Sequence, residues 1–198
     1  MMGVKLQNQS LVELAWAQLR DDIVFDFYSP GDKLNIEALK KRYEMGGTPI
    51  REALNRLVVE GLVEMLPLRG FRVGLTSVIQ GRDILENRLR LEGFLAEQAM
   101  IAADDEWESR CIAALHRLRR CMEQGDFHTH AGRVRWGELS RLFIFELYSL
   151  NQPSWLTTAY SGLYLHYMRY EFLVFSAQER PDRLVRAQFQ SYDKILNF

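Results

Sequence analysis

The stretch "GGTPIREALNRLVVEGLV", residues 46–63, decides the fold of the first part of this chain. Thr48 is expected to cap a helix whose first position is Pro49, because that position needs no backbone N–H. Apolar residues then recur on one helix face at Ile50, Ala53, Leu54, Leu57 and Val58. Arg51 and Asn55, four residues apart, lie on another face. The pattern predicts a helix that packs by one side and presents its other side, and its N-terminal end, to a partner.

Two further helices are predicted before this stretch. Ser10 and Glu13 form a capping box that predicts a helix to about residue 27. Asn35 is a good N-cap for a shorter second helix. The pair Gly46–Gly47 is expected to end that helix, because glycine accepts a positive φ without strain.

A hairpin is predicted after it. Gly61 is expected to end the third helix. Segments 62–66 and 71–75 then alternate as two short strands around the turn "PLRG". Three short helices followed by a two-stranded ribbon predict a winged helix-turn-helix with a small β wing.

The second part of the chain has a different texture. Long helical patterns are separated by short breaks rich in Asp, Gly and Pro, a spacing that is typical of an antiparallel all-α bundle. The predicted helices cover residues 77–103, 105–124, 132–150, 154–176 and 182 to the end. The fold class is therefore mainly α, with a first domain over 1–76 and a helical domain over 77–198.

Bulk composition narrows the functional classes. The chain has 198 residues, a net charge of −1, and two cysteines that predict free thiols in a reducing cytoplasm. It shows neither an apolar run of membrane-spanning length nor a secretory signal. We find no paired carboxylates, nucleophile elbow, phosphate loop or metal triad, so we do not expect an enzyme.

Local charge favours a nucleic-acid partner for the first domain. A helix N-terminus with Thr48 and Arg51 suits a phosphate or a base edge in the DNA major groove. The turn at Arg69 and Gly70 suits the minor groove. Residues 1–76 carry ten cations and ten anions, so binding depends on local clusters such as the one that includes Lys41 and Arg42. A protein-interaction module, with these charges as solvated helix residues, is the alternative.

The segment "TPIREALNRLVVEGLVEMLPLRGFRV", residues 48–73, resembles the GntR family of bacterial transcription regulators. The resemblance implies that Thr48 and Arg51 contact DNA and that Arg69 and Gly70 form the wing tip. We add Asn55, on the same exposed face, and Lys41 and Arg42 as further DNA-binding candidates: Lys41, Arg42, Thr48, Arg51, Asn55, Arg69 and Gly70.

Two positions depart from the family pattern. The family usually has Arg where this chain has Gly47, and a cation where it has Glu37. Both changes remove positive charge, so the usual operator sequence is not expected to carry over. Lys41 or Arg42 could compensate.

The helical half resembles the FadR-like branch with an FCD ligand-binding domain. "DILENRLRLEGFLAEQA" (83–99) and "FIFELYSLNQPSWL" (143–156) carry that resemblance. Many such domains hold a divalent metal, but the matching positions here are Ser140, Ile144 and Phe189, which cannot ligate one. We therefore expect no metal or other cofactor. The four histidines have no i,i+4 partner set either.

Aromatic residues crowd the helices from residue 136 to residue 175. They form a core and dimer surface, or else they line a small-molecule pocket closed by a few polar groups. Without a metal, an arginine would neutralise a carboxylate effector. The candidates for effector binding are Arg88, Tyr148, Asn151, Tyr167 and Arg169.

The chain ends about one helix short of the usual FCD domain. The pocket is then open, covered by a dimer partner, or not functional. The leading hypothesis is a homodimeric, cytoplasmic bacterial repressor that binds a palindromic operator on the nucleoid, responds to a small organic acid and has no membrane partner. The alternative is a ligand-sensing or protein-interaction adaptor that has lost sequence-specific DNA binding.

Overall fold

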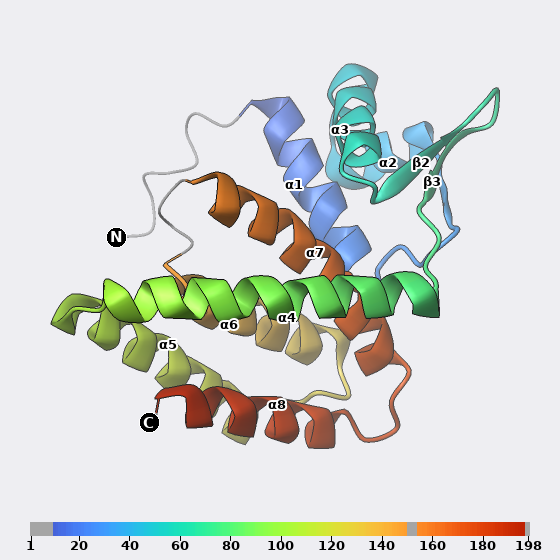
Figure 1. The fold of residues 1–198 in the computed structure, drawn as a ribbon. Helices are drawn as coiled ribbons and strands as arrows, with labels where there is room; N and C mark the ends of the chain where they lie inside the picture. The colour runs from blue at the N-terminus through green and yellow to red at the C-terminus, as the bar shows by residue number, and fades with distance from the viewer. Residues whose placement is uncertain (1–9, 150–153, 197–198) are drawn as a thin grey trace. The chain divides into compact units, whose positions relative to one another are not determined.

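The computed structural model describes residues 10–149 and 154–196, which belong to two compact units, Met1–Ser77 and Val78–Phe198 (Figure 1). Each unit is described by itself. The expected fold class is confirmed: the chain is mainly helical, with a small wing sheet in the first unit and a helical bundle in the second.

The first unit contains three helices and a three-stranded antiparallel sheet in the described residues. Its helices are α1 (Leu11–Val24), α2 (Ile36–Tyr43) and α3 (Gly47–Val59). Its strands are β1 (Lys33–Leu34), β2 (Val63–Leu66) and β3 (Gly70–Val73), in the order β1-β3-β2. The predicted capping box at Ser10 and the Asn35 cap are both confirmed.

The core of this unit lies between α1 and α3. Four residues of the predicted α3 stripe are fully buried: Ile50, Ala53, Leu54 and Leu57. Val58, at the edge of the stripe, is only half-buried. On the surface beside this seam, the Trp16 indole N–H donates to both Glu60 carboxylate oxygens at 2.9 and 3.0 Å, and the Arg56 guanidinium lies 3.6 Å from the Trp16 ring centroid. These contacts join the middle of α1 to the end of α3.

The start of α3 differs from the prediction. Gly46, in extended backbone, is the N-cap and makes no side-chain cap, so Thr48 is the second helical residue and Pro49 the third. Proline fits there because none of the first four helical N–H groups has an intrahelical partner. The left-handed residue that ends α2 is Glu44 (φ 54°), not a glycine.

Two other predictions were also wrong, one about a helix boundary and one about the number of wing strands. The first helix ends at Val24 rather than near residue 27, because the chain turns at Asp26 (φ 56°). The wing has a third strand, β1, in which Lys33 lies opposite Arg72 and Leu34 opposite Phe71. A two-residue strand is too short to show an alternating pattern, so it escaped the sequence analysis.

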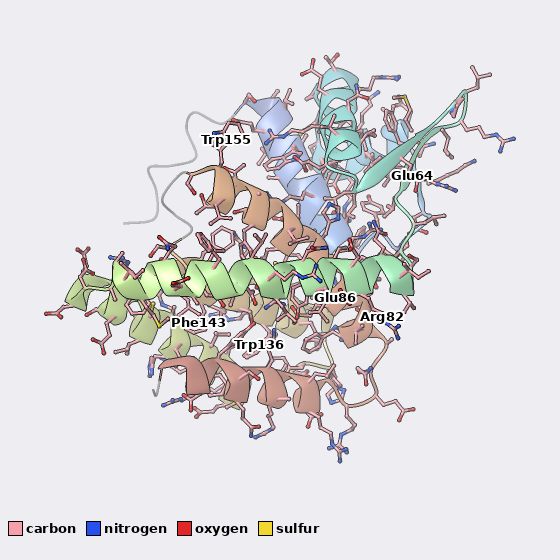
Figure 2. All side chains as sticks on the ribbon, in the orientation of Figure 1. Glu64, Arg82, Glu86, Trp136, Phe143 and Trp155 are labelled. Carbon is pink, nitrogen blue, oxygen red and sulfur yellow. The ribbon has the colours of Figure 1, made fainter. Side chains whose placement is uncertain are left out.

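The second unit contains five helices in its described residues: α4 (Val78–Ile101), α5 (Asp105–Gln124), α6 (His130–Leu147), α7 (Trp155–Ser176) and α8 (Pro181–Leu196). Helix α4 packs on α7, and α5 packs on both α6 and α8. The largest fully buried side chains are aromatic and include Trp136 and Phe143 on α6, labelled in Figure 2. No helix among the described residues is long and apolar enough to cross a membrane.

The buried apolar face of α3, formed by Ile50, Ala53, Leu54 and Leu57, provides a stability test. Leu57→Ala removes a fully buried side chain, and we expect it to lower the free energy of unfolding by about 2–5 kcal/mol. Val59→Ala, at an 88% exposed position two residues away, should change it by less than about 0.5 kcal/mol. Urea denaturation of both variants measures the difference, and equal effects would contradict the assignment of the packed face.

Candidate nucleic-acid interface and effector site

The exposed face of α3 carries the predicted recognition residues. Thr48, Arg51 and Asn55 are all exposed, and the Arg51 side chain has no ion-pair or hydrogen-bond partner in the part of the chain that the structure describes. Because Gly46 supplies no side-chain acceptor, the first N–H groups of α3 have no side-chain cap. This arrangement leaves both the guanidinium and the positive end of the helix dipole available to an anion.

The cations of α2 divide into two groups. Lys40 pairs with Glu37 at 2.8 Å, and Arg42 pairs with Asp22 at 2.9 Å while lying 3.6 Å from the Phe27 ring centroid. Arg42 therefore ties α2 to α1 and the turn after it. Lys41 is exposed and has no such partner among the described residues. That Lys41 and Arg42 bind DNA stays a prediction. Lys41 has fewer contacts within the protein that would compete with DNA.

The wing presents Arg69 and Gly70 at its tip. Both are exposed, and Gly70 has φ +86° with nothing within 4 Å of where a Cβ would lie. Below the tip, Arg72 donates to Glu64 at 2.6 and 2.9 Å across the hairpin. The pair stiffens the ribbon under an exposed, cationic end.

The second unit places Arg88 in a buried ionic network. Its Nε donates to the Glu92 carboxylate at 2.7 Å, and both side chains are about one-tenth exposed. The Tyr160 hydroxyl donates to the same carboxylate oxygen, and the Arg88 guanidinium lies 3.7 Å from the Tyr167 ring centroid. Burial alone would lower the pKa of Arg88, because it disfavours the cation. The electrostatic effects of Tyr167 and Glu92 are larger together and raise the pKa of Arg88. Arg88 thus stays charged, and the Glu92 carboxylate is its anionic partner within the protein.

A second carboxylate lies on α7. Glu171 accepts hydrogen bonds from the Tyr167 hydroxyl at 2.8 Å and from Gln188 Nε2 at 2.7 Å. Gln188 in turn accepts from the Trp136 indole N–H at 2.7 Å. Desolvation raises the pKa of Glu171, and the hydrogen bonds from its neighbours only partly oppose that effect. The network continues across α6, α7 and α8.

The structure brings together several of the predicted effector residues. Arg88 contacts Tyr167, and Tyr148 packs edge-on against Tyr160 with ring centroids 6.0 Å apart. Arg169 is buried on α7. The remaining candidate, Asn151, lies outside the described residues.

Sequence reasoning missed the polar partners: Glu92, Tyr160, Glu171 and Gln188. A spacing signal was available for two of them, because Glu92 follows Arg88 by four residues and Glu171 follows Tyr167 by four residues, and such pairs meet on a helix. Tyr160 and Gln188 reach their partners from other helices, and only the packing of the bundle shows them.

Two family profiles match this chain. The profile described as "Bacterial regulatory proteins, gntR family" matches residues 11–73, and the FCD domain profile matches residues 83–197. The chain belongs to the GntR family, in the group that carries an FCD domain. The expected resemblance is thereby confirmed in both halves.

Relatives of the same family cover most of the chain. The uncharacterized HTH-type transcriptional regulator BphR of Paraburkholderia xenovorans is 35% identical over 180 residues, which are 91% of this chain and 73% of BphR. The HTH-type transcriptional repressor GlaR of Escherichia coli is 36% identical over 102 residues, 52% of this chain and 46% of GlaR. The match to GlaR therefore spans about half of each protein.

Solved structures share the fold. The Escherichia coli protein McbR/YncC has a TM-score of 0.69 at 21% identity, covering 96% of this chain and 98% of that one. A putative GntR regulator from Rhodococcus has a TM-score of 0.65 at 18% identity, covering 96% and 93%.

The family's metal positions are apolar or small in this GntR chain. Ser140, Ile144 and Phe189 are buried on α6 and α8, and the Ser140 hydroxyl has no hydrogen-bond partner within residues 10–149 and 154–196. Among the described residues, no three His, Cys, Asp or Glu side chains come together as a metal site. The donor set does not fit a divalent cation, and a regulator without a bound metal stays our prediction.

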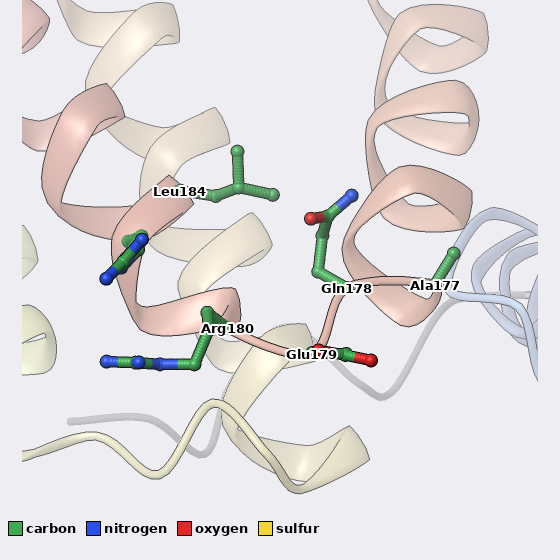
Figure 3. A pocket seen from close by; sticks show the side chains of 6 residues that line it. Ala177, Gln178, Glu179, Arg180 and Leu184 are labelled. Atoms are coloured by element: carbon green, nitrogen blue, oxygen red, sulfur yellow. The ribbon is translucent and has the colours of Figure 1, made fainter.

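A surface hollow of about 420 Å³ lies at the turn between α7 and α8 (Figure 3). Its lining comes from residues 177–180, Arg183 and Leu184, and none of these is a predicted effector residue. Glu179 and Arg180 are exposed there. No aromatic side chain among the described residues lines this hollow, whereas tyrosines surround Arg88.

The raised pKa of Glu171 predicts how the free energy of unfolding changes with pH. Between the ordinary glutamate pKa and the raised one, the folded state binds more protons than the unfolded state, so wild-type stability falls as pH rises across that window. Glu171→Gln keeps the acceptor oxygen but cannot ionise. We expect the stability of E171Q relative to wild type to increase from below pH 4.5 to neutral pH.

Urea unfolding midpoints of wild type and E171Q across this pH range measure the effect. A difference between the two proteins that does not change with pH would contradict a raised pKa for Glu171.

Proposed function

We propose that this GntR-family chain is a DNA-binding transcription regulator, acting as a repressor on a palindromic operator. The main support is that the N-terminal half of α3 is exposed on one face. Arg51 lies on this face, away from the buried apolar residues of the helix. A helix of this kind fits the major groove, where an arginine reads guanine through its O6 and N7 acceptors. The wing tip at Arg69 and Gly70 supports a second contact in the adjacent minor groove.

We further propose that the regulator acts as a homodimer at the bacterial nucleoid. Equal numbers of cations and anions in residues 1–76 predict weak non-specific affinity for one protomer. Two copies double the phosphate contacts and place two α3 helices in successive major grooves of a palindrome. Dimerisation therefore supplies the affinity that the charge of one protomer lacks.

The Arg88 network supports a small-molecule effector site in the helical unit. A carboxylate effector would use Arg88, but Glu92 already occupies that guanidinium at 2.7 Å. Binding therefore exchanges an internal carboxylate for an external one and rearranges α4 against α7. A coupling of about 1–3 kcal/mol between such a rearrangement and the DNA-binding unit is the ordinary size for allosteric regulators.

A second candidate function is an adaptor that no longer binds DNA. Gly47 and Glu37 favour it, because both stand where the family usually has a cation, and Glu37 also pairs with Lys40. Salt-dependent binding of the protein to DNA upstream of its own gene would exclude this candidate.

The role of Arg51 is tested by Arg51→Ala. We expect a loss of affinity of at least about fivefold for DNA selected from a random pool by the wild-type protein, because a bidentate arginine–guanine contact is worth about 1–3 kcal/mol and a loss of about 1 kcal/mol corresponds to about fivefold. Arg90→Ala removes an exposed arginine of α4 and serves as the charge-matched control. Fluorescence anisotropy measures both, and equal affinities of R51A and R90A would refute the assigned role.

The missing charge at Gly47 is tested by Gly47→Arg. A Cβ there meets only the Lys40 side chain at 3.7 Å, so the substitution fits. One added phosphate contact per protomer should steepen the slope of log affinity against log salt by about 1.8 for the dimer, about 0.9 from each protomer. Anisotropy titrations at several salt concentrations measure the slope. No change in slope would place position 47 away from the DNA backbone.

A further inference from the structure

The turn at the tip of the wing holds a leucine in a conformation that leucine disfavours. The Arg69 N–H donates to the Leu66 carbonyl at 3.0 Å, with Pro67 second in the turn and Leu68 third. Leu68 has φ +60°. Proline in second place followed by a positive φ is the pattern of a type II turn, whose third position normally holds Gly or Asn. Leu68 therefore replaces a residue that would fit without strain.

Packing does not compensate for this strain. The Leu68 side chain is 107% exposed, so it buries no apolar surface in the wing. Single exposed leucines are common on protein surfaces, but this one is both fully exposed and in the left-handed region. Such a residue points to a role outside the folded unit.

The surroundings of Leu68 indicate what it meets. Arg69 is next in the chain and exposed, and Gly70 lets another backbone approach without a Cβ in the way. Below them, Glu64 joins Arg72 and also accepts from the Leu75 N–H at 3.2 Å. Pairing of β1 with β3 adds a third strand to the base of the wing. The tip is thus a stiff hairpin with an apolar side chain beside a cation.

We infer that Leu68 is an apolar wedge that enters the DNA minor groove and partly unstacks a base step, while Arg69 holds the groove and its phosphates. Minor-groove proteins use leucine in this way together with arginine. Flexible pyrimidine–purine steps unstack most easily, so the wing should favour TA or CA/TG at its contact point. The inference rests on the proposed function and adds a specificity-determining residue to it.

The test uses the full-length protein and a duplex selected from a random pool, with 2-aminopurine replacing each adenine in turn. Wild-type binding should raise the fluorescence of the probe at one step, because 2-aminopurine brightens when it unstacks. Leu68→Asn keeps a side chain that tolerates a positive φ but removes the apolar wedge. We expect L68N to lose this signal and about tenfold in affinity, and to unfold at the same temperature as wild type or higher.

Two further variants complete the design. Leu68→Met keeps an apolar tip and should restore most of the fluorescence signal. Leu11→Asn removes a 62% exposed apolar residue of the same unit, on α1 and outside the proposed contact, and should bind as wild type does.

The failures are distinguishable. If L68N binds with unchanged affinity and an unchanged fluorescence signal while R51A loses binding, the wedge is refuted and the regulator stands. If L68N instead lowers dimer formation in sedimentation without changing the DNA signals, Leu68 contacts protein and the wedge is again refuted. If the wild-type protein selects no DNA, the proposed function itself fails.

Discussion

Burial of one side of α3 is the constraint on which the first unit depends. Four side chains of this helix are fully buried, and they fix its rotation about its own axis. Each residue turns a helix by about 100°, so positions four apart return to nearly the same side. Arg51, Asn55 and Val59 are all exposed for that reason. The same apolar contacts that stabilise the unit therefore determine which groups it presents to a partner.

The helical unit follows a different rule, because its core contains charge. Tyr160 and Arg88 both donate to Glu92, which links α7 to α4, while Gln188 links α8 to Trp136 on α6 and to Glu171 on α7. A buried charge without a partner is strongly destabilising, and in this arrangement of the helices both network carboxylates, Glu92 and Glu171, accept hydrogen bonds. A ligand that enters this network has to replace one of its bonds, and this is how binding would move a helix.

Sequence patterns and structure agree best where the physics is local. Asp104 caps α5, and Ser154 caps α7 with Thr157 in a capping box, and both helices begin where the breaks in the pattern predict. The errors differ in kind. Gly46, in extended backbone, took the N-cap position two residues before Thr48. A two-residue strand joined the wing because its backbone pairs with β3, which is distant in sequence. For the candidate sites, the sequence predicted Arg51 and Arg88, but it did not predict Glu171 and Gln188, which belong to the buried network of the helical unit.

The sequence by itself determined the order of the helices, the family, the buried face of α3 and the residue types at its exposed end, because capping, periodicity and helix breaking act within a few positions. Only the tertiary structure decided that Arg42 is tied to Asp22, that Tyr160 joins the Arg88–Glu92 pair from another helix, and that Leu68 projects from a strained turn. Each of these depends on which side chains meet across elements, or on a backbone conformation against the residue's own preference. Neither can be deduced from spacing along the chain.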